Sequence, residues 1–136
     1  MAKAALIISA LMAVSTLMIA ERASAQTRVV SGQLGVLGEW ELTATVTKQT
    51  DAGGRLWSGP LSLKHIGFCG VDGPEQKTGE VRLEIPDPVS GSPAEATATL
   101  LIDGTACTFK GRLADGYDGA MACPDRPNVP MILMVQ

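Results

Sequence analysis

The chain has 136 residues with 11 basic and 14 acidic side chains, so its formal net charge is −3 with its one histidine neutral. A chain of this length is expected to form one domain. The basic residues are scattered singly, without a basic run, which argues against nucleic acid and against an anionic membrane surface as partners.

The first 25 residues have the anatomy of a bacterial signal peptide. Lys3 gives the start a positive charge, and residues 4–20 contain no charged side chain. Ala23-Ser24-Ala25 then places small residues at the −3 and −1 positions of a cleavage site between Ala25 and Gln26. The alternative is an uncleaved membrane anchor, because the uncharged run is close to the roughly 20 residues that span a bilayer. The small-residue triplet and the polar residues that follow it favour cleavage.

Cleavage at this position leaves residues 26–136 as a single exported domain. Nine bases and 13 acids remain, and 9 − 13 gives a formal charge of −4. We expect this domain in the periplasm or outside the cell, with no membrane insertion after processing.

An alternation of apolar and polar residues dominates the sequence after Gln26. In residues 40–47 every second residue is apolar, and residues 80–85 repeat the pattern before Pro86 ends it. This period of two is typical of half-buried β-strands. Shorter candidates are residues 108–113 and 131–135, and the pattern does not reveal which face of the second is buried. Residues 28–37 are a further candidate, broken by glycines.

Turn signals divide the domain at short intervals. They lie at residues 51–54, 58–60, 71–74, 89–93, 103–104, 115–116 and 118–119. About seven or eight strands joined by such turns predict an all-β fold, a small antiparallel meander that forms a barrel or a sandwich.

Residues 92–103 allow two interpretations. Ser92, Pro93 and Glu95 resemble a helix start. Apolar residues nevertheless alternate from Ala96 to Ile102, and Asp103-Gly104 is a preferred hairpin turn. That turn would pair Ile102 with Thr105, Leu100 with Cys107 and Ala98 with Phe109, with the apolar residues on one face. We therefore predict a strand.

The three cysteines predict one disulfide. If the chain folds back around Asp115, Cys107 and Cys123 lie opposite each other, because each is eight residues from that pivot. Opposed residues in an antiparallel pair have Cα atoms about 4.5–5.5 Å apart, which suits a disulfide. Cys69 is then a buried free thiol, or it replaces one of the two partners. A zinc site is disfavoured, because only His65 and Cys69 form a closely spaced ligand pair.

No catalytic motif stands out in the sequence. His65 is the only histidine, so any mechanism that needs a histidine depends on it. Neither Gly-x-Ser-x-Gly nor Cys-x-x-Cys occurs. The simpler interpretation of His65 is a hydrogen-bonded residue at a strand end. We expect no catalytic residues, no metal site and no cofactor.

The aromatic residues are few. Gly38-Glu39-Trp40 resembles the Gly-x-Trp opening of lipocalins and other calycin barrels, over three residues. This resemblance implies a barrel that binds a small ligand or inhibits a protease. From the residues themselves, Trp40 is expected to fill the core. Trp57 and Tyr117 lie near predicted turns, and with His65 they are the candidate binding residues.

These features predict an exported binding module that is not an enzyme. An open barrel would hold a small apolar ligand, in space left by Ala44, Ala96 and Ala98. A filled barrel would use its loops against a protein partner, as an inhibitor or as an envelope component. A hydrolase that uses His65 is the third hypothesis.

Overall fold

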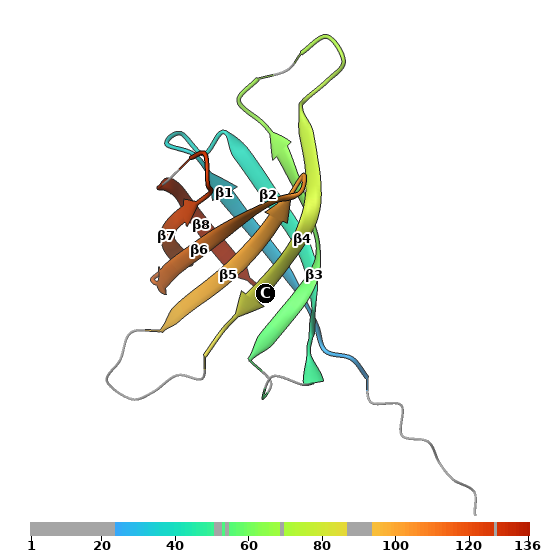
Figure 1. The fold of residues 1–136 in the computed structure, drawn as a ribbon, viewed down its shortest axis with the longest axis vertical. Helices are drawn as coiled ribbons and strands as arrows, with labels where there is room; N and C mark the ends of the chain where they lie inside the picture. Colours follow the sequence, from blue (N-terminus) through green and yellow to red (C-terminus); the bar gives the residue numbers. More distant parts are fainter. Residues whose placement is uncertain (1–23, 51–52, 54, 69, 87–93, 127) are drawn as a thin grey trace, which may run out of the picture.

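The structure is a computed structural model, and it describes residues 24–136 except 51–52, 54, 69, 87–93 and 127. Eight strands run antiparallel, each paired with the next, and the last pairs with the first to close a barrel (Figure 1). The strands are β1 (Thr27–Leu34), β2 (Trp40–Lys48), β3 (Leu56–His65), β4 (Gln76–Glu84), β5 (Glu95–Ile102), β6 (Thr105–Leu113), β7 (Tyr117–Ala122) and β8 (Val129–Val135). The predicted all-β meander is confirmed, and its architecture is a barrel. Residues 1–23 of the predicted signal peptide lie outside the described residues, and its cleavage between Ala25 and Gln26 stays a prediction.

The alternation in the sequence places every second side chain inside the barrel. In β2 the buried residues are Leu42, Ala44 and Val46, while the threonines between them are exposed. In β8 Met131 and Leu133 are buried, which settles the face that the sequence left open. Among the described residues every buried side chain of the core is apolar and none is charged or polar. Burial of this continuous apolar interior is the main force that holds the barrel together.

The β5–β6 hairpin has the predicted register. Asp103 and Gly104 both have positive φ, 47° and 81°, as a two-residue hairpin turn requires. Ile102 pairs with Thr105, Leu100 with Cys107 and Ala98 with Phe109. The segment that resembled a helix start therefore leads into a strand, because the alternation and the turn outweigh the capping residues.

Two turn predictions are wrong. Ser58-Gly59-Pro60 lies inside β3, and Asp118-Gly119 lies inside β7. At both glycines a neighbouring strand approaches closely, since a Cβ on Gly59 or Gly119 would lie 1.9 Å from a backbone carbonyl oxygen across the sheet. Glycine inside a strand allows two backbones to approach closely. In the sequence such a glycine cannot be told from one in a turn, and this is why both turns were predicted.

The loops divide between the two ends of the barrel. One end, which we call the mouth, carries loops 35–39, 66–75, 103–104 and 123–128 (Figure 1). The opposite end carries the connections from β2 to β3, from β4 to β5 and from β6 to β7. Within the described residues there is no helix with the length and hydropathy needed to cross a membrane.

Candidate functional site

A pocket of about 220 Å³ opens at the mouth. Its walls are the mouth-side ends of all eight strands, and its apolar lining includes Leu34, Trp40, Leu63, Ile102, Met121 and Val129. Polar side chains also line it, namely Lys77, Asp103, Thr105, Asp125 and Arg126. An apolar cup with a few polar groups is the usual composition of a ligand site.

The size of this mouth pocket limits what it can hold. Pockets for drug-sized ligands usually measure about 300–1,000 Å³. A cavity of about 150 Å³ in an engineered protein binds benzene. At about 220 Å³, the mouth pocket suits one aromatic ring or one large apolar side chain.

The Cys107–Cys123 disulfide forms part of the pocket wall, and its predicted pairing is confirmed. The Cα atoms of the two residues lie 4.3 Å apart. The pairing follows from the β6–β7 register, in which Thr108 opposes Ala122 and the next residues outward are the two cysteines. The bond therefore fixes two strands at the mouth. Cys69 lies outside the described residues.

The Trp40 ring at the pocket wall is held by contacts with His65 and Lys77. His65 ends β3 and pairs with Trp40 at the start of β2. Their rings meet edge to face, with centroids 4.7 Å apart and planes at 82°. The Nζ atom of Lys77 lies 5.3 Å from the Trp40 ring centroid and 3.8 Å from a carboxylate oxygen of Glu75. Contacts of this kind are worth about 0.5–1.5 kcal/mol each, so they hold the Trp40 ring in place at the pocket wall.

Large apolar side chains are exposed on two loops at the mouth end of the barrel. We call them the apolar rim, and they are exposed by 84% (Val36), 91% (Leu37), 47% (Ile66), 70% (Phe68) and 106% (Val71). From the sequence, Val36 and Leu37 were expected in a strand over residues 28–37, and only Val71 in a turn. The rim was therefore missed, because β1 ends at Leu34. The signal was present, because large apolar residues stand between glycines at residues 35–38 and 67–73.

The two loops of the apolar rim are joined at their bases. The backbone N–H of Ile66 donates a hydrogen bond of 2.8 Å to the carbonyl oxygen of Glu39, and that of Gly67 donates one of 3.3 Å to the same oxygen. The Glu39 carboxylate in turn accepts a 3.0 Å hydrogen bond from the backbone N–H of Leu37. The rim residues are therefore held at one end of the barrel as neighbouring parts of one surface.

Two of the three candidate binding residues lie in the core. Trp57 is 5% exposed and Tyr117 is 9% exposed, so neither offers its ring to a partner, and this expectation is corrected. Trp57 faces inward because residues 58–60 continue the strand in place of the expected turn. The third candidate, His65, lies near the mouth pocket through its contact with Trp40.

The three alanines expected to leave room inside the barrel do not line the mouth pocket. Ala44, Ala96 and Ala98 are all buried in the core. Ala98 pairs with Phe109 across the hairpin, and the Phe109 ring lies over Gly111, where a Cβ would be 2.5 Å from it. The bulk of this ring offsets the small residues around it.

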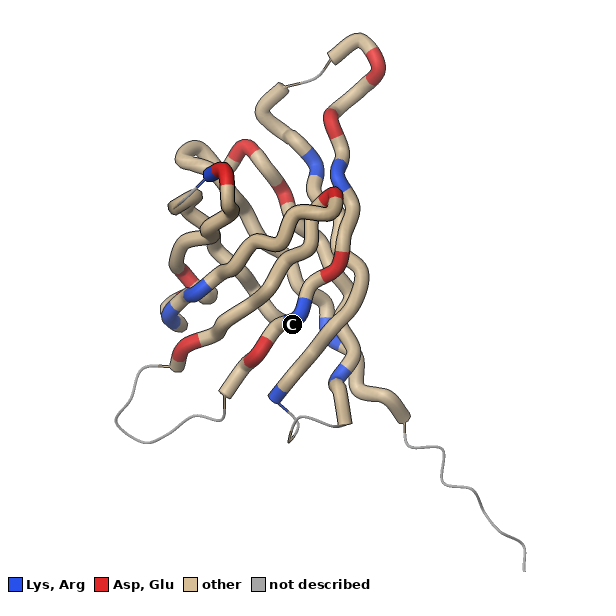
Figure 2. Tube along the Cα trace, in the orientation of Figure 1, with Lys and Arg blue, Asp and Glu red and all other residues tan. Residues whose placement is uncertain are grey.

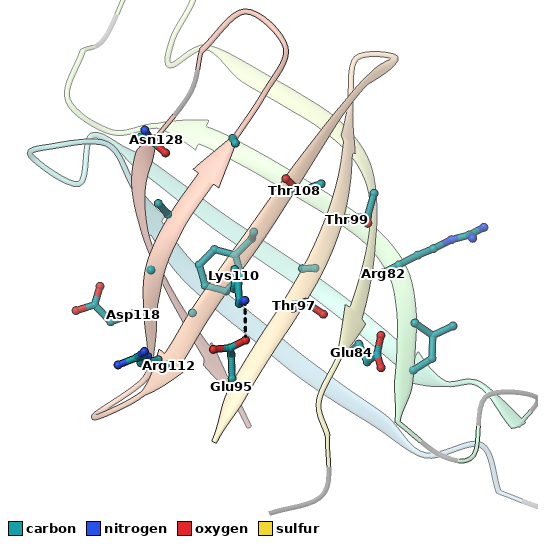
Figure 3. Close-up of a pocket in the computed structure, with 17 residues that line it drawn as sticks. Arg82, Glu84, Glu95, Thr97, Thr99, Thr108, Lys110, Arg112, Asp118 and Asn128 are labelled. Carbon is teal, nitrogen blue, oxygen red and sulfur yellow. Dashed lines mark ion pairs between the residues drawn. The ribbon is translucent and has the colours of Figure 1, made fainter. Parts of the chain in front are cut away.

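A second depression, of about 920 Å³, lies on the outer face of β4 to β7 (Figure 3). Its charged lining is balanced, with bases at Arg82, Lys110 and Arg112 and acids at Glu84, Glu95 and Asp118. Glu95 pairs with Arg112 across the sheet, Arg112 pairs with Asp118, and Lys110 lies 3.2 Å from Glu95. Cross-strand pairs of opposite charge are typical of a solvated sheet face and explain this lining without a ligand.

The described residues bring no three or more of the side chains His, Cys, Asp and Glu together in a group that could hold a metal ion. The apolar mouth, with its pocket and rim, is thus the feature of the described surface that points to binding. Comparison of the chain with family models, with curated proteins and with solved structures found no match.

Proposed function

We propose that this protein is an exported, non-catalytic binding module that holds an apolar side chain of a protein partner in the mouth pocket. The observation that carries the proposal is the coincidence of an apolar pocket and five exposed apolar side chains at one end of the barrel. An interface with a buried anchor side chain and a surrounding ring of contacts is the common arrangement in protein complexes.

Exposure of the apolar rim favours a binding role over a structural one. Single exposed apolar residues are ordinary on protein surfaces, whereas a group of them around a pocket marks an interaction site. The pocket volume favours a side chain over a larger free ligand. A small apolar compound of similar size remains the second form of the same proposal.

The proposed location rests on the disulfide and on the leader sequence. Disulfides form and persist in oxidising compartments and are rare in the cytosol. The Cys107–Cys123 bond is compatible with export, and residues 1–25 have the pattern of a signal peptide. The partner is then an envelope or extracellular protein.

Two substitutions in β8 test the proposal. Val129 and Val135 are both partly buried, but only Val129 lines the mouth pocket. Val129→Phe fills the pocket, whereas Val135→Phe adds the same bulk at the other end of the strand. Each costs on the order of 1–3 kcal/mol of stability by overpacking, so the pair is matched for folding.

The measurement is calorimetric titration with N-acetyl-phenylalaninamide, a model of an apolar side chain. We expect saturable binding to the wild type and to the Val135→Phe variant, and its loss in the Val129→Phe variant. Wild-type protein that gives no saturable heat, or equal binding to both variants, would overturn the proposal.

A further inference from the structure

We infer that the partner segment is cationic, with Arg or Lys beside the apolar side chain that enters the mouth pocket. This inference rests on the proposed function and adds the chemistry of the partner. It comes from the charges on the four mouth loops. An apolar side chain in the pocket would not by itself require those charges.

Acidic residues are concentrated on the mouth loops. Loops 35–39, 66–75, 103–104 and 123–128 hold five of the chain's 14 acids and one of its 11 bases, and 1 − 5 gives a charge of −4 in 23 residues. The acids are Glu39, Asp72, Glu75, Asp103 and Asp125, and the base is Arg126. Acidic residues are visible along these loops in Figure 2.

The acids lie where a partner's charges would meet them. Asp103 and Asp125 line the mouth pocket, and both are exposed. Asp72 follows the rim residue Val71 directly, and Glu39 lies two residues after Leu37. A cationic group within two or three residues of an anchored side chain would therefore lie near one of these carboxylates.

Two bases, Lys77 and Arg126, line the mouth pocket beside Asp103 and Asp125. Lys77 contacts both the Trp40 ring and Glu75. Its charge thus offsets that of Glu75. With Lys77 counted beside the loops, the mouth has five acids and two bases, and 2 − 5 leaves a net charge of −3. Excess charge of one sign over an apolar patch steers partners of the opposite sign and rejects those of the same sign.

The same charges disfavour two other occupants. An anionic membrane surface would be repelled by loops with a charge of −4. Mouth-to-mouth contact with a second copy would bring the same acidic loops together, so like charge would oppose it. A segment of another protein with both apolar and cationic side chains could contact the apolar rim and pair its charges with the acidic loops.

The test uses peptides and the full chain, purified as the cell processes it and labelled with ¹⁵N. Three amidated peptides have the form Gly-X-Phe-X-Gly, with X as Arg, Glu or Ser. The chain has two tryptophans, so its spectrum has two indole N–H signals. Trp40 lines the pocket and reports binding, while Trp57 lies in the core away from that lining and is the internal reference.

We expect the Arg peptide to bind about tenfold more tightly than the Glu peptide at low salt, with the Ser peptide between them. The preference should shrink to about threefold or less at 0.5 M salt, where exposed charges are screened. Movement of the Trp40 signal with equal affinity for all three peptides would overturn this inference and leave the proposed function standing. No Trp40 response to any peptide would overturn both.

Two sets of substitutions locate the effect. The mouth variant D72N/D103N/D125N removes three of the five acids, and Asn is suited to position 103 because it tolerates a positive φ. The control variant E84Q/D115N/D118N removes the same charge outside the mouth. We expect the Arg-over-Glu preference to fall to about threefold or less in the mouth variant and to persist in the control.

Equal loss of the preference in both triple variants would show that net charge, and not the mouth loops, sets it, and would overturn the inference. Sedimentation with zwitterionic phosphatidylcholine vesicles separates a protein partner from a membrane. We expect the protein to stay in the supernatant. Sedimentation that is abolished by Phe68→Ser would show that the rim binds lipid and would overturn a cationic protein partner.

Discussion

Removal of the Cys107–Cys123 disulfide should lower the free energy of unfolding by an amount set by the length of the loop that the bond closes. The bond joins residues separated by 16 positions in sequence, at the mouth end of the β6–β7 pair. Loop-closure entropy for a loop of this length is about 3 kcal/mol at 25 °C. For a domain of roughly 100 residues, that loss corresponds to a fall in Tm of about 12–20 °C.

The variant to measure is C107A/C123A, because two alanines introduce no new polar group at the buried Cys107 position. Guanidinium unfolding followed by circular dichroism should show a lower midpoint, with the free energy of unfolding reduced by about 3 kcal/mol. Cys69→Ala is the control, because the bond in the structure does not use Cys69. A loss below about 1 kcal/mol in the double variant would refute the loop-entropy reasoning. An equal loss in Cys69→Ala would refute the pairing.

Four further results are expected. Phe109→Ala should lower the free energy of unfolding, measured with denaturant, by about 3–5 kcal/mol, because its ring lies over Gly111 in the buried core. A loss below about 1 kcal/mol would show that the ring does not fill the core there. Gly59→Ala should destabilise the barrel strongly, because the new Cβ would lie 1.9 Å from the carbonyl oxygen of Thr45. Gly70→Ala should change the free energy of unfolding by less than about 0.5 kcal/mol. Similar Tm values for the two variants would contradict the close approach of β2 and β3. His65→Ala should lower the free energy of unfolding by about 0.5–1.5 kcal/mol, because its contact with the Trp40 ring is lost. We expect no hydrolytic activity that depends on this residue. A hydrolytic activity that disappears in the variant would identify an enzyme. Mass spectrometry of the exported form should give a chain that begins at Gln26, and a chain that begins at Met1 would rule out the predicted cleavage.

Local periodicity was sufficient to predict six of the eight strands and one hairpin. No strand was assigned to β3 or β7, where turns were expected at residues 58–60 and 118–119. Alternation and the Asp103-Gly104 turn fixed the β5–β6 register, and the pivot at Asp115 gave the pairing of Cys107 with Cys123. These features depend on residues close in sequence, where side-chain period and turn chemistry are decisive. The sequence left closure of the sheet open, because pairing of β1 with β8 joins segments about 100 residues apart.

The candidate site was harder to predict for the same reason. Trp57 and Tyr117 were expected at the surface from their neighbouring Gly and Pro residues, but Gly59 and Gly119 serve the close approach of strands. The apolar rim consists of residues that look ordinary singly. Leu37 and Phe68 lie on loops that only the folded barrel brings to the same end (Figure 1).

The most direct test of binding at the mouth is the position of a bound apolar group. Nuclear Overhauser contacts between the ring protons of N-acetyl-phenylalaninamide and the protein's methyl groups report that position. We expect contacts to Leu34, Ile102 and Met121, which line the mouth pocket, and none to Ala44 or Ala96 in the core. Contacts to the core alanines, or contacts confined to the outer face of β4 to β7, would contradict binding at the mouth.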